Sequence, residues 1–304
     1  MRALRAHQPG GPEHLVEEDG PVPVPGIGDA LVRVHAASFT PDELGWPSTW
    51  VDRTGHDRRP VIPGHEVSGV VTALGYGTTG VAVGDAVYGL TDWYRDGAAA
   101  EYVAVEARNL ARKPDRLDHR TAATVPMVAL TSQQGLFDLG HLSPGQTVAV
   151  LGAGGGVGTF AVQLARAAGA RVVAVARAWA CDLLRGLGAE VYVDVDRAPL
   201  GDVDLVFDLV GGETLRRSCV ALKPGGAVVS VVERPPVATG RRGWFFVVEP
   251  SRPQLLELGQ RIAAGELHPV VGASWPLRDG RAAFEAKQRG GQPGKAVLLL
   301  TDER

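Results

Sequence analysis

The strongest structural signal in the chain is Thr147-Val-Ala-Val-Leu-Gly-Ala-Gly-Gly-Gly-Val-Gly158, continued by Thr159-Phe-Ala-Val-Gln-Leu-Ala-Arg166. Residues 147–151 lean apolar and predict a buried parallel strand, which a glycine-rich turn and an amphipathic helix ending at Gly169 follow. Glycines let the backbone approach a phosphate closely, and the N–H groups and positive dipole end of a helix N-terminus stabilise its negative charge. The segment therefore predicts a turn that binds the pyrophosphate of a dinucleotide.

The spacing of the glycines in this turn departs from the usual fingerprint. Gly152, Gly155 and Gly158 give G-x-x-G-x-x-G instead of G-x-G-x-x-G, and a glycine turn can also serve helix–strand packing alone. A second apolar strand, Ala170–Ala176, follows about 20 residues later, where the fingerprint expects the residue that contacts the ribose. We therefore favour a dinucleotide site over a structural turn. The residues of the turn predicted to bind the cofactor are Gly152, Gly154, Gly155, Gly156, Val157 and Gly158.

The composition indicates an ordinary globular protein with a small-molecule partner. The 304 residues leave room for two domains, and 45% hydrophobic and 21% charged residues are typical of soluble chains. A net charge of −3 gives no reason to expect nucleic acid or an anionic membrane as a partner. No apolar run reaches the roughly 18 residues of a membrane span, and the start of the chain does not resemble a signal peptide. Cys181 and Cys219 do not form a ligand-like pair, which favours a reducing, cytoplasmic setting without disulfides.

The sequence has two regions with different patterns of apolar residues, and together they predict an α/β protein. Up to about residue 125 short β signals prevail, and from Leu117 helices alternate with apolar strands in the manner of a doubly wound parallel sheet. A helix from near Pro253 to Gly265 and a strand at Lys295–Leu300 follow, and the latter is expected to return to the first domain. The strands expected before these are 30–36, 67–74, 86–90 and 101–105 in the first part, and 147–151, 171–176, 191–195, 203–207 and 227–232 in the second.

Several motifs in the same order resemble the medium-chain dehydrogenase/reductase superfamily, and most closely its zinc-free, quinone oxidoreductase-like branch. They are Ile62-Pro-Gly-His-Glu-Val-Ser-Gly-Val-Val71, Val83-Gly-Asp-Ala-Val-Tyr-Gly89, Gly97-Ala-Ala-Ala-Glu-Tyr-Val103, Ala122-Ala-Thr-Val-Pro126, the glycine turn, Phe207-Asp-Leu-Val-Gly-Gly-Glu-Thr214, Leu222-Lys-Pro-Gly-Gly226 and Gly294-Lys-Ala-Val-Leu298. The resemblance implies a GroES-like catalytic domain over 1–124 and 266–304, a Rossmann NADP-binding domain over 125–265, and an active site in the cleft between them.

The resemblance also bears on metal binding. His65, in Gly64-His65-Glu66, matches a zinc-ligating histidine of the alcohol dehydrogenase branch, but a zinc site needs three or four converging ligands. Segments 37–42 and 130–132 lack the cysteines of that branch, the four-cysteine structural loop is absent, and Cys181 is expected on a surface helix. We therefore predict no metal and a cleft-lining or structural role for His65. Relatives without zinc reduce quinones or activated carbon–carbon double bonds, because conjugation already makes these acceptors electrophilic.

The end of the second Rossmann strand indicates NADP(H) as the cofactor. It reads Ala174-Val-Ala-Arg-Ala-Trp179, without the carboxylate that contacts the ribose hydroxyls in NAD sites. Ala176 and Arg177 are therefore predicted to border the cofactor, with Arg177 contacting the 2′-phosphate; an ordinary surface arginine is the alternative. Arg241 and Arg242 are weaker candidates for the same contact.

The resemblance also suggests which residues border the nicotinamide and the substrate. Those expected near the cofactor are Thr131, Val210, Val231, Phe245, Phe246 and Val247, and the apolar members could equally be ordinary core. The catalytic residue is unknown, with Thr40, Glu43, His65 and Tyr94 as cleft candidates. Tyr88 or solvent could also supply the proton of an enone reduction.

Together these features predict an NADPH-dependent quinone or enone oxidoreductase that works without zinc. Two alternatives stay open: a biosynthetic enoyl reductase with one dedicated substrate, and a non-catalytic protein that only binds NADPH. Relatives often form homodimers through the edge strands of their cofactor domains. The segment before Trp244 could take that part if Pro235 and Pro236 lie outside the paired strand.

Overall fold

The computed structural model describes residues 1–192, 200–236 and 238–300, in two compact units. One unit is Val128–Glu249, and the other joins Met1–Met127 to the segment that begins at Pro250. Among the described residues, no helix combines the length and the apolar composition needed to cross a membrane.

The unit Val128–Glu249 is built on a parallel sheet with the strand order β10-β9-β8-β11-β12-β13. Its strands are β8 (Thr147–Leu151), β9 (Arg171–Val175), β10 (Glu190–Tyr192), β11 (Val203–Asp208), β12 (Leu222–Ser230) and β13 (Arg242–Phe245). This order confirms the doubly wound Rossmann sheet expected from the sequence. Of the strand expected at 191–195, residues 193–195 lie outside the described part of the chain.

The helices of this unit follow the expected alternation with the strands. They are α3 (Pro126–Gln133, which begins at the boundary of the unit), a π-helix at Gln134–Leu139, α4 (Gly156–Ala167), α5 (Cys181–Gly186) and α6 (Gly212–Ser218). Helix α4 packs on β8 and β9 through an almost wholly buried face, and Gly169, at φ 77°, lets the chain turn back after it. Cys181 begins α5, which follows β9 and has exposed residues such as Asp182 and Arg185, as expected of a surface helix, while the Cys181 side chain itself is buried.

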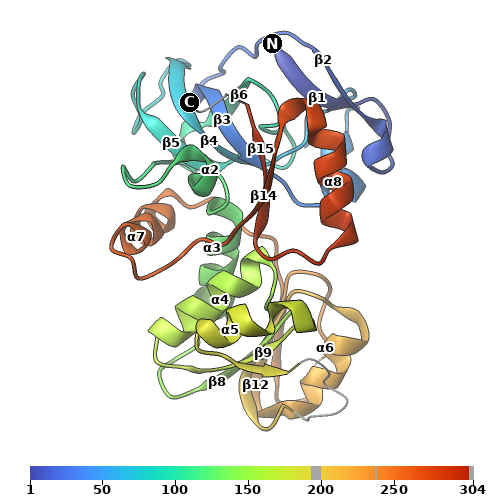
Figure 1. Ribbon diagram of the computed structural model, residues 1–304, viewed down its shortest axis with the longest axis vertical. Coiled ribbons are helices and arrows are strands. Elements are labelled where there is room, and N and C mark those ends of the chain that lie inside the picture. The colour runs from blue at the N-terminus through green and yellow to red at the C-terminus, as the bar shows by residue number, and fades with distance from the viewer. Residues whose placement is uncertain (193–199, 237, 301–304) are drawn as a thin grey trace. The chain divides into compact units, whose positions relative to one another are not determined.

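The other unit contains a β-rich body whose strands pair antiparallel except for β14 and β15, which run parallel to each other. Its strands are β1 (Arg2–Ala6), β2 (Leu15–Asp19), β3 (Asp29–Ser38), β4 (Glu66–Leu74), β5 (Ala86–Leu90), β6 (Tyr102–Glu106), β7 (Leu110–Arg112), β14 (Val271–Pro276) and β15 (Lys295–Leu299). Strand β15, near the end of the chain, pairs antiparallel with β3, and the two run side by side in Figure 1. The late strand therefore does return to complete the first domain, as the sequence indicated.

The α-helices among the described residues of this unit are α1 (Pro47–Trp50), α2 (His119–Ala122), α7 (Arg252–Ala263) and α8 (Gly280–Arg289). Phe284 of α8 stacks on Phe39, with ring centroids 3.8 Å apart, in an apolar core of the unit. Trp50 ends α1.

Helix α7 belongs to the β-rich unit, whereas the sequence assigned residues 250–265 to the Rossmann domain. The buried Tyr88 hydroxyl donates to the Leu255 carbonyl at 2.5 Å, and the Arg252 guanidinium donates to the carbonyls of Leu110 and Ala107. These bonds between residues far apart in the chain left no periodic signal in the sequence, which is why the boundary found near Pro250 differs from the one expected at 265.

Candidate functional site

The glycine turn follows β8 at the point where the strand order of the parallel sheet reverses. From β8 the chain moves through α4 to β9 on one side, and β11 lies on the other side. Gly152 has φ 78°, and a Cβ atom there would lie 2.8 Å from Cγ2 of Val210, so the loops after β8 and β11 meet at this glycine. A Cβ on Gly158 would lie 2.4 Å from Cα of Ala153. Both positions therefore require glycine, and such a crevice is where open α/β sheets bind ligands.

The first turn of α4 can accept an anion. Its N-cap, Gly155, has no side chain to cap the first N–H groups of the helix. The neighbouring helix α3 is fixed to this turn by the Ser132 hydroxyl, whose Oγ lies 2.9 Å from the Val157 carbonyl. Thr131, predicted to contact the cofactor, precedes Ser132 and is buried. The uncapped amides and the side-chain-free turn fit a pyrophosphate group.

A chain of hydrogen bonds holds the loops that follow β11 and β12. Asp208 is fully buried and accepts the N–H groups of Val210 (3.1 Å) and Gly211 (2.9 Å), as well as the Ser230 hydroxyl (2.6 Å). The Ser230 hydroxyl oxygen in turn accepts the N–H groups of Val232 and Glu233. The two loops are therefore fixed relative to each other at the carboxyl edge of the sheet.

Exposed apolar side chains gather at this carboxyl edge. They are Trp179, Val210, Val232, Phe245 and Val247, with exposed fractions of 41, 49, 47, 44 and 58%. Each lies at or just beyond the end of β9, β11, β12 or β13, and among the described residues of the unit only Val220 is a comparably exposed large apolar side chain elsewhere. Apolar side chains left open beside a phosphate-binding turn are typical of a ligand site.

The structure brings most of the predicted cofactor residues to this edge. Val231 and Phe246 are partly exposed there, beside the apolar side chains above. After β9, Ala176 is buried and Arg177 is exposed, and a short 3-10 helix, Ala178–Ala180, follows. Arg241 instead donates to the carbonyls of Cys219 and Leu222, and Arg242 lies over the ring of Trp244.

In the β-rich unit, Glu43 belongs to a buried group of three ionisable residues. Its carboxylate accepts the N–H groups of Gly64 at 2.5 Å and Thr40 at 3.2 Å. Lys295 of β15 forms an ion pair with Glu66 of β4 at 2.5 Å. Glu43, Glu66 and Lys295 are 0, 0 and 6% exposed, so the group holds two carboxylates and one ammonium out of reach of bulk water.

Burial is the main influence on the acidity of Glu43. It raises the pKa of Glu43 to about 7, against the opposing effect of the two backbone N–H groups and of Lys295. Glu66 has a further partner, since its other oxygen accepts the N–H group of Met127 at 3.0 Å. Near neutral pH, Glu43 can therefore gain or lose a proton.

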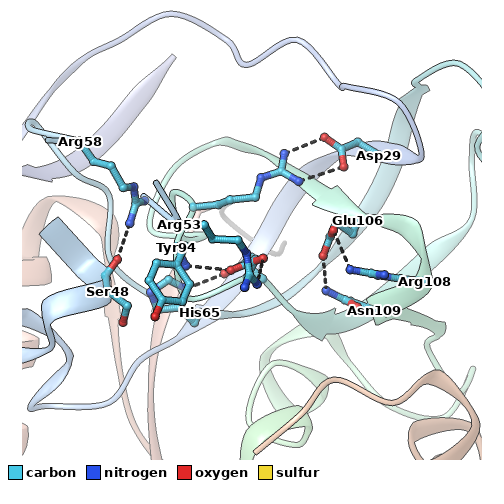
Figure 2. Close-up of polar contacts among 12 residues, drawn as sticks. Asp29, Ser48, Arg53, Arg58, His65, Tyr94, Glu106, Arg108 and Asn109 are labelled. Carbon is cyan, nitrogen blue, oxygen red and sulfur yellow. Dashed lines mark hydrogen bonds and ion pairs between the residues drawn. The ribbon is translucent and has the colours of Figure 1, made fainter. Parts of the chain in front are cut away.

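His65 and Tyr94 have local structural partners. His65 is 1% exposed, its Nδ1 lies 2.7 Å from the Thr91 hydroxyl, and burial lowers its pKa to about 3, so the imidazole is neutral. Figure 2 shows Arg53 beside Tyr94, where its guanidinium lies 4.9 Å from the ring centroid. The Arg53 guanidinium also forms a 2.6 Å ion pair with Asp92. Within the described part of the chain, no three His, Cys, Asp or Glu side chains are grouped so as to hold a metal ion.

Comparison with known proteins gives a consistent result. A model of the alcohol dehydrogenase GroES-like domain matches residues 26–115, and a model of the zinc-binding dehydrogenase family matches residues 187–298. An NADPH-dependent alkenal/one oxidoreductase of Arabidopsis thaliana chloroplasts is 32% identical, over 88% of this chain and 71% of that protein. The chain belongs to the medium-chain dehydrogenase/reductase superfamily.

Two further relatives share the whole length of this superfamily member. A quinone oxidoreductase of Pongo abelii is 29% identical, over 99% of this chain and 98% of that protein. The solved structure of the quinone oxidoreductase from Coxiella burnetii has a TM-score of 0.90, with 28% identity and 99% coverage of both chains. These similarities confirm the quinone oxidoreductase-like branch predicted from the motifs, and the protein is an NAD(P)H oxidoreductase of the superfamily.

Several residues of this reductase went unnoticed as site candidates in the sequence. Glu66 and Lys295 are each the first residue of an otherwise largely apolar strand, and this position was a usable signal, because a charge at a buried strand needs a partner. Asp208 ends an apolar strand in a similar way. The sequence did not show which charged residues form a pair. Glu66 and Lys295 lie far apart in the sequence and come together because β4 and β15 both pair with β3.

Proposed function

We propose that the protein is a zinc-independent, NADPH-dependent oxidoreductase that transfers hydride to a quinone or an α,β-unsaturated carbonyl compound. The observation that carries the proposal is the carboxyl edge of the Rossmann sheet, where a side-chain-free turn, an uncapped helix and exposed apolar side chains lie together. The names of the relatives, a quinone oxidoreductase and an NADPH-dependent alkenal/one oxidoreductase, support the substrate class.

The residues at this edge fit NADPH. Bound NADPH would supply a hydride from C4 of its nicotinamide. The N–H groups of the first turn of α4 would bind the pyrophosphate, and Arg177 would form a charge-assisted contact with the 2′-phosphate. Thr131 and the loops held by Asp208 would position the nicotinamide end, while Val210, Val231, Phe245, Phe246 and Val247 would exclude water.

Zinc independence is supported by the partners of His65 and by the residues around it. The His65 Nδ1 atom is engaged by the Thr91 hydroxyl, and Ser38 and Ser132 stand near positions where zinc enzymes of the superfamily carry cysteine. A conjugated acceptor needs no Lewis acid, because hydride adds to its already electrophilic carbon and the enolate or quinol oxygen takes a proton. Of the predicted candidates Thr40, Glu43, His65 and Tyr94, Thr40 and Tyr94 are partly exposed and could face the acceptor, whereas Glu43 and His65 are buried.

The experiment is NADPH oxidation by the purified protein with a panel of quinones and enones, before and after dialysis against a strong chelator. We expect turnover with NADPH at a lower KM than with NADH, and no loss of rate when metal is removed. Failure of every acceptor would contradict the enzyme assignment, and tight NADPH binding without turnover would favour the non-catalytic alternative. Activity with only one enone would identify a dedicated enoyl reductase.

We also propose a cytoplasmic homodimer. Strand β13 lies at one edge of the described sheet, and most of its residues are exposed. Pro235 and Pro236 lie outside this strand, so β13 can pair edge to edge with the same strand of a second copy. Light scattering on the purified chain measures the mass directly, and a value of 31.9 kDa would contradict the dimer.

A further inference from the structure

Trp179 stands beside the glycine turn. It lies in the short 3-10 helix Ala178–Ala180, two residues beyond Arg177, and 41% of its surface is exposed. The neighbouring Ala180 is buried. Burial of a large apolar ring normally stabilises a protein, and much of this indole ring is not buried. We therefore expect a ligand to cover its exposed surface.

The packing of Trp179 accounts for one glycine of the turn. A Cβ atom on Gly154 would lie 3.1 Å from Cη2 and 3.5 Å from Cζ3 of Trp179, and 2.6 Å from Cβ of Ala180. The outer edge of the six-membered ring therefore lies against the backbone of the turn. With this edge fixed, the indole ring is held next to the segment that would bind the pyrophosphate.

The position of Trp179 in the fold points to one end of the cofactor. In Rossmann domains the pyrophosphate lies at the first glycine turn, and the end of the second strand contacts the ribose of the adenosine. Trp179 follows the second strand, β9, and lies on the first turn, so it borders the adenosine half. The nicotinamide half lies toward β11 and β12.

We propose that Trp179 is the adenine-binding residue of this reductase, with its indole ring stacking on the base while Arg177 contacts the 2′-phosphate beside it. The inference rests on the proposed NADPH site and adds the residue that recognises the base. Aromatic side chains stack on nucleobases favourably and without sequence preference, because every base offers a π face. Trp179 would thus add binding affinity for the adenosine half of the cofactor through stacking, without itself selecting adenine over other bases.

The test is calorimetric titration of the full-length protein with adenosine 2′,5′-bisphosphate and with 5′-AMP, fragments that contain no nicotinamide. We expect Trp179→Ala to weaken both fragments about tenfold or more, and Trp179→Phe, which keeps a stacking ring, to weaken them by less than about threefold. Arg177→Gln should weaken only the bisphosphate, while Arg185→Gln, an exposed arginine paired with Asp182, serves as the control. Equal binding by wild type and Trp179→Ala would overturn the proposal.

A second measurement does not depend on the stability of the alanine variant. If the base stacks on Trp179, adenosine 2′,5′-bisphosphate should change the tryptophan emission of the wild-type protein, and this change should vanish in Trp179→Phe although binding persists. An unaltered change in Trp179→Phe would assign the signal to another of the six tryptophans and refute the stacking. Failure of the wild type to bind either NADPH or NADH would instead refute the proposed function itself.

Discussion

Glu43 is completely buried next to an ion pair of one carboxylate and one ammonium group. Its neighbours Glu66 and Lys295 neutralise each other, so an ionised Glu43 is stabilised chiefly by the N–H groups of Gly64 and Thr40. Those two bonds join the turn after β3 to the loop before β4, and both segments carry residues expected near the acceptor. The charge on one side chain therefore affects how firmly two candidate site segments are held together.

Glu43→Gln should flatten the pH dependence of stability. A carboxyl group whose pKa is raised in the folded state contributes full stability below its unfolded pKa, here 4.5, and loses that contribution as the pH rises through about 7. The difference between these two pKa values corresponds to a change of at most about 3 kcal/mol in the free energy of unfolding. Denaturant unfolding at pH 5 and pH 8 should show a larger loss for the wild type than for the variant.

The control for this measurement is Glu257→Gln, which removes an exposed carboxylate from α7. It should follow the wild-type profile. If the wild type and Glu43→Gln lose stability equally between pH 5 and pH 8, the elevated pKa of Glu43 is refuted.

At the scale of elements, the sequence predicted best where a pattern is local. The period of apolar residues located β8, β9 and β11, and the glycines located the turn between β8 and α4. The short strands β1, β2, β7 and β14 were not predicted. Strands β7 and β14 each pair with a strand that other elements separate from them in the sequence, whereas β1 and β2 pair with each other across a short 3-10 helix. The candidate cofactor residues at the carboxyl edge of the Rossmann sheet could be proposed from the sequence because they follow local sequence patterns. The partners of Asp208 and Glu66 could not, because they depend on tertiary contacts.

Gly158→Ala should disturb the junction of the turn with α4. The new Cβ atom would lie 2.4 Å from Cα of Ala153, so either the helix or the turn must move, at a cost of about 1–3 kcal/mol. We expect a lower melting temperature and weaker NADPH binding in isothermal titration.

Gly186→Ala is the matched control, because this glycine ends α5 with nothing within 4 Å of the added atom. It should leave NADPH binding unchanged and raise stability slightly, since alanine favours the helix. Equal behaviour of the two variants would show that the close approach at Gly158 has no energetic importance.

At the scale of the whole molecule, the two ends of the chain complete one unit. Strand β15 pairs with β3, α7 is bonded to Tyr88, and Lys295 places its ammonium group next to Glu66. The Rossmann unit is made entirely from the residues between them. Stability of the β-rich unit therefore depends on a segment that the sequence separates from it by the full cofactor domain.

Lys295→Met tests this dependence. Removing one partner of a buried ion pair leaves the other charge uncompensated, and we expect a loss of about 3–5 kcal/mol in the free energy of unfolding. The double variant Lys295→Met with Glu66→Gln should recover part of that loss, as measured by a double-mutant cycle in urea. A loss below about 1 kcal/mol for the single variant would contradict the role of this pair.

The pairing of β15 with β3 also sets an order of events on the ribosome. At about 5–20 residues per second, Ser38 is synthesised roughly 10 to 50 s before its partner Val297. During that interval residues Ala36–Ser38 of the nascent β3 have no β15 strand to pair with. Glu66 likewise lacks the ammonium group of Lys295. The strands of the Rossmann unit, in contrast, are all synthesised before residue 250. The cofactor domain can thus form first on the emerging chain, and β15, which is translated after it, closes the domain that was begun before it.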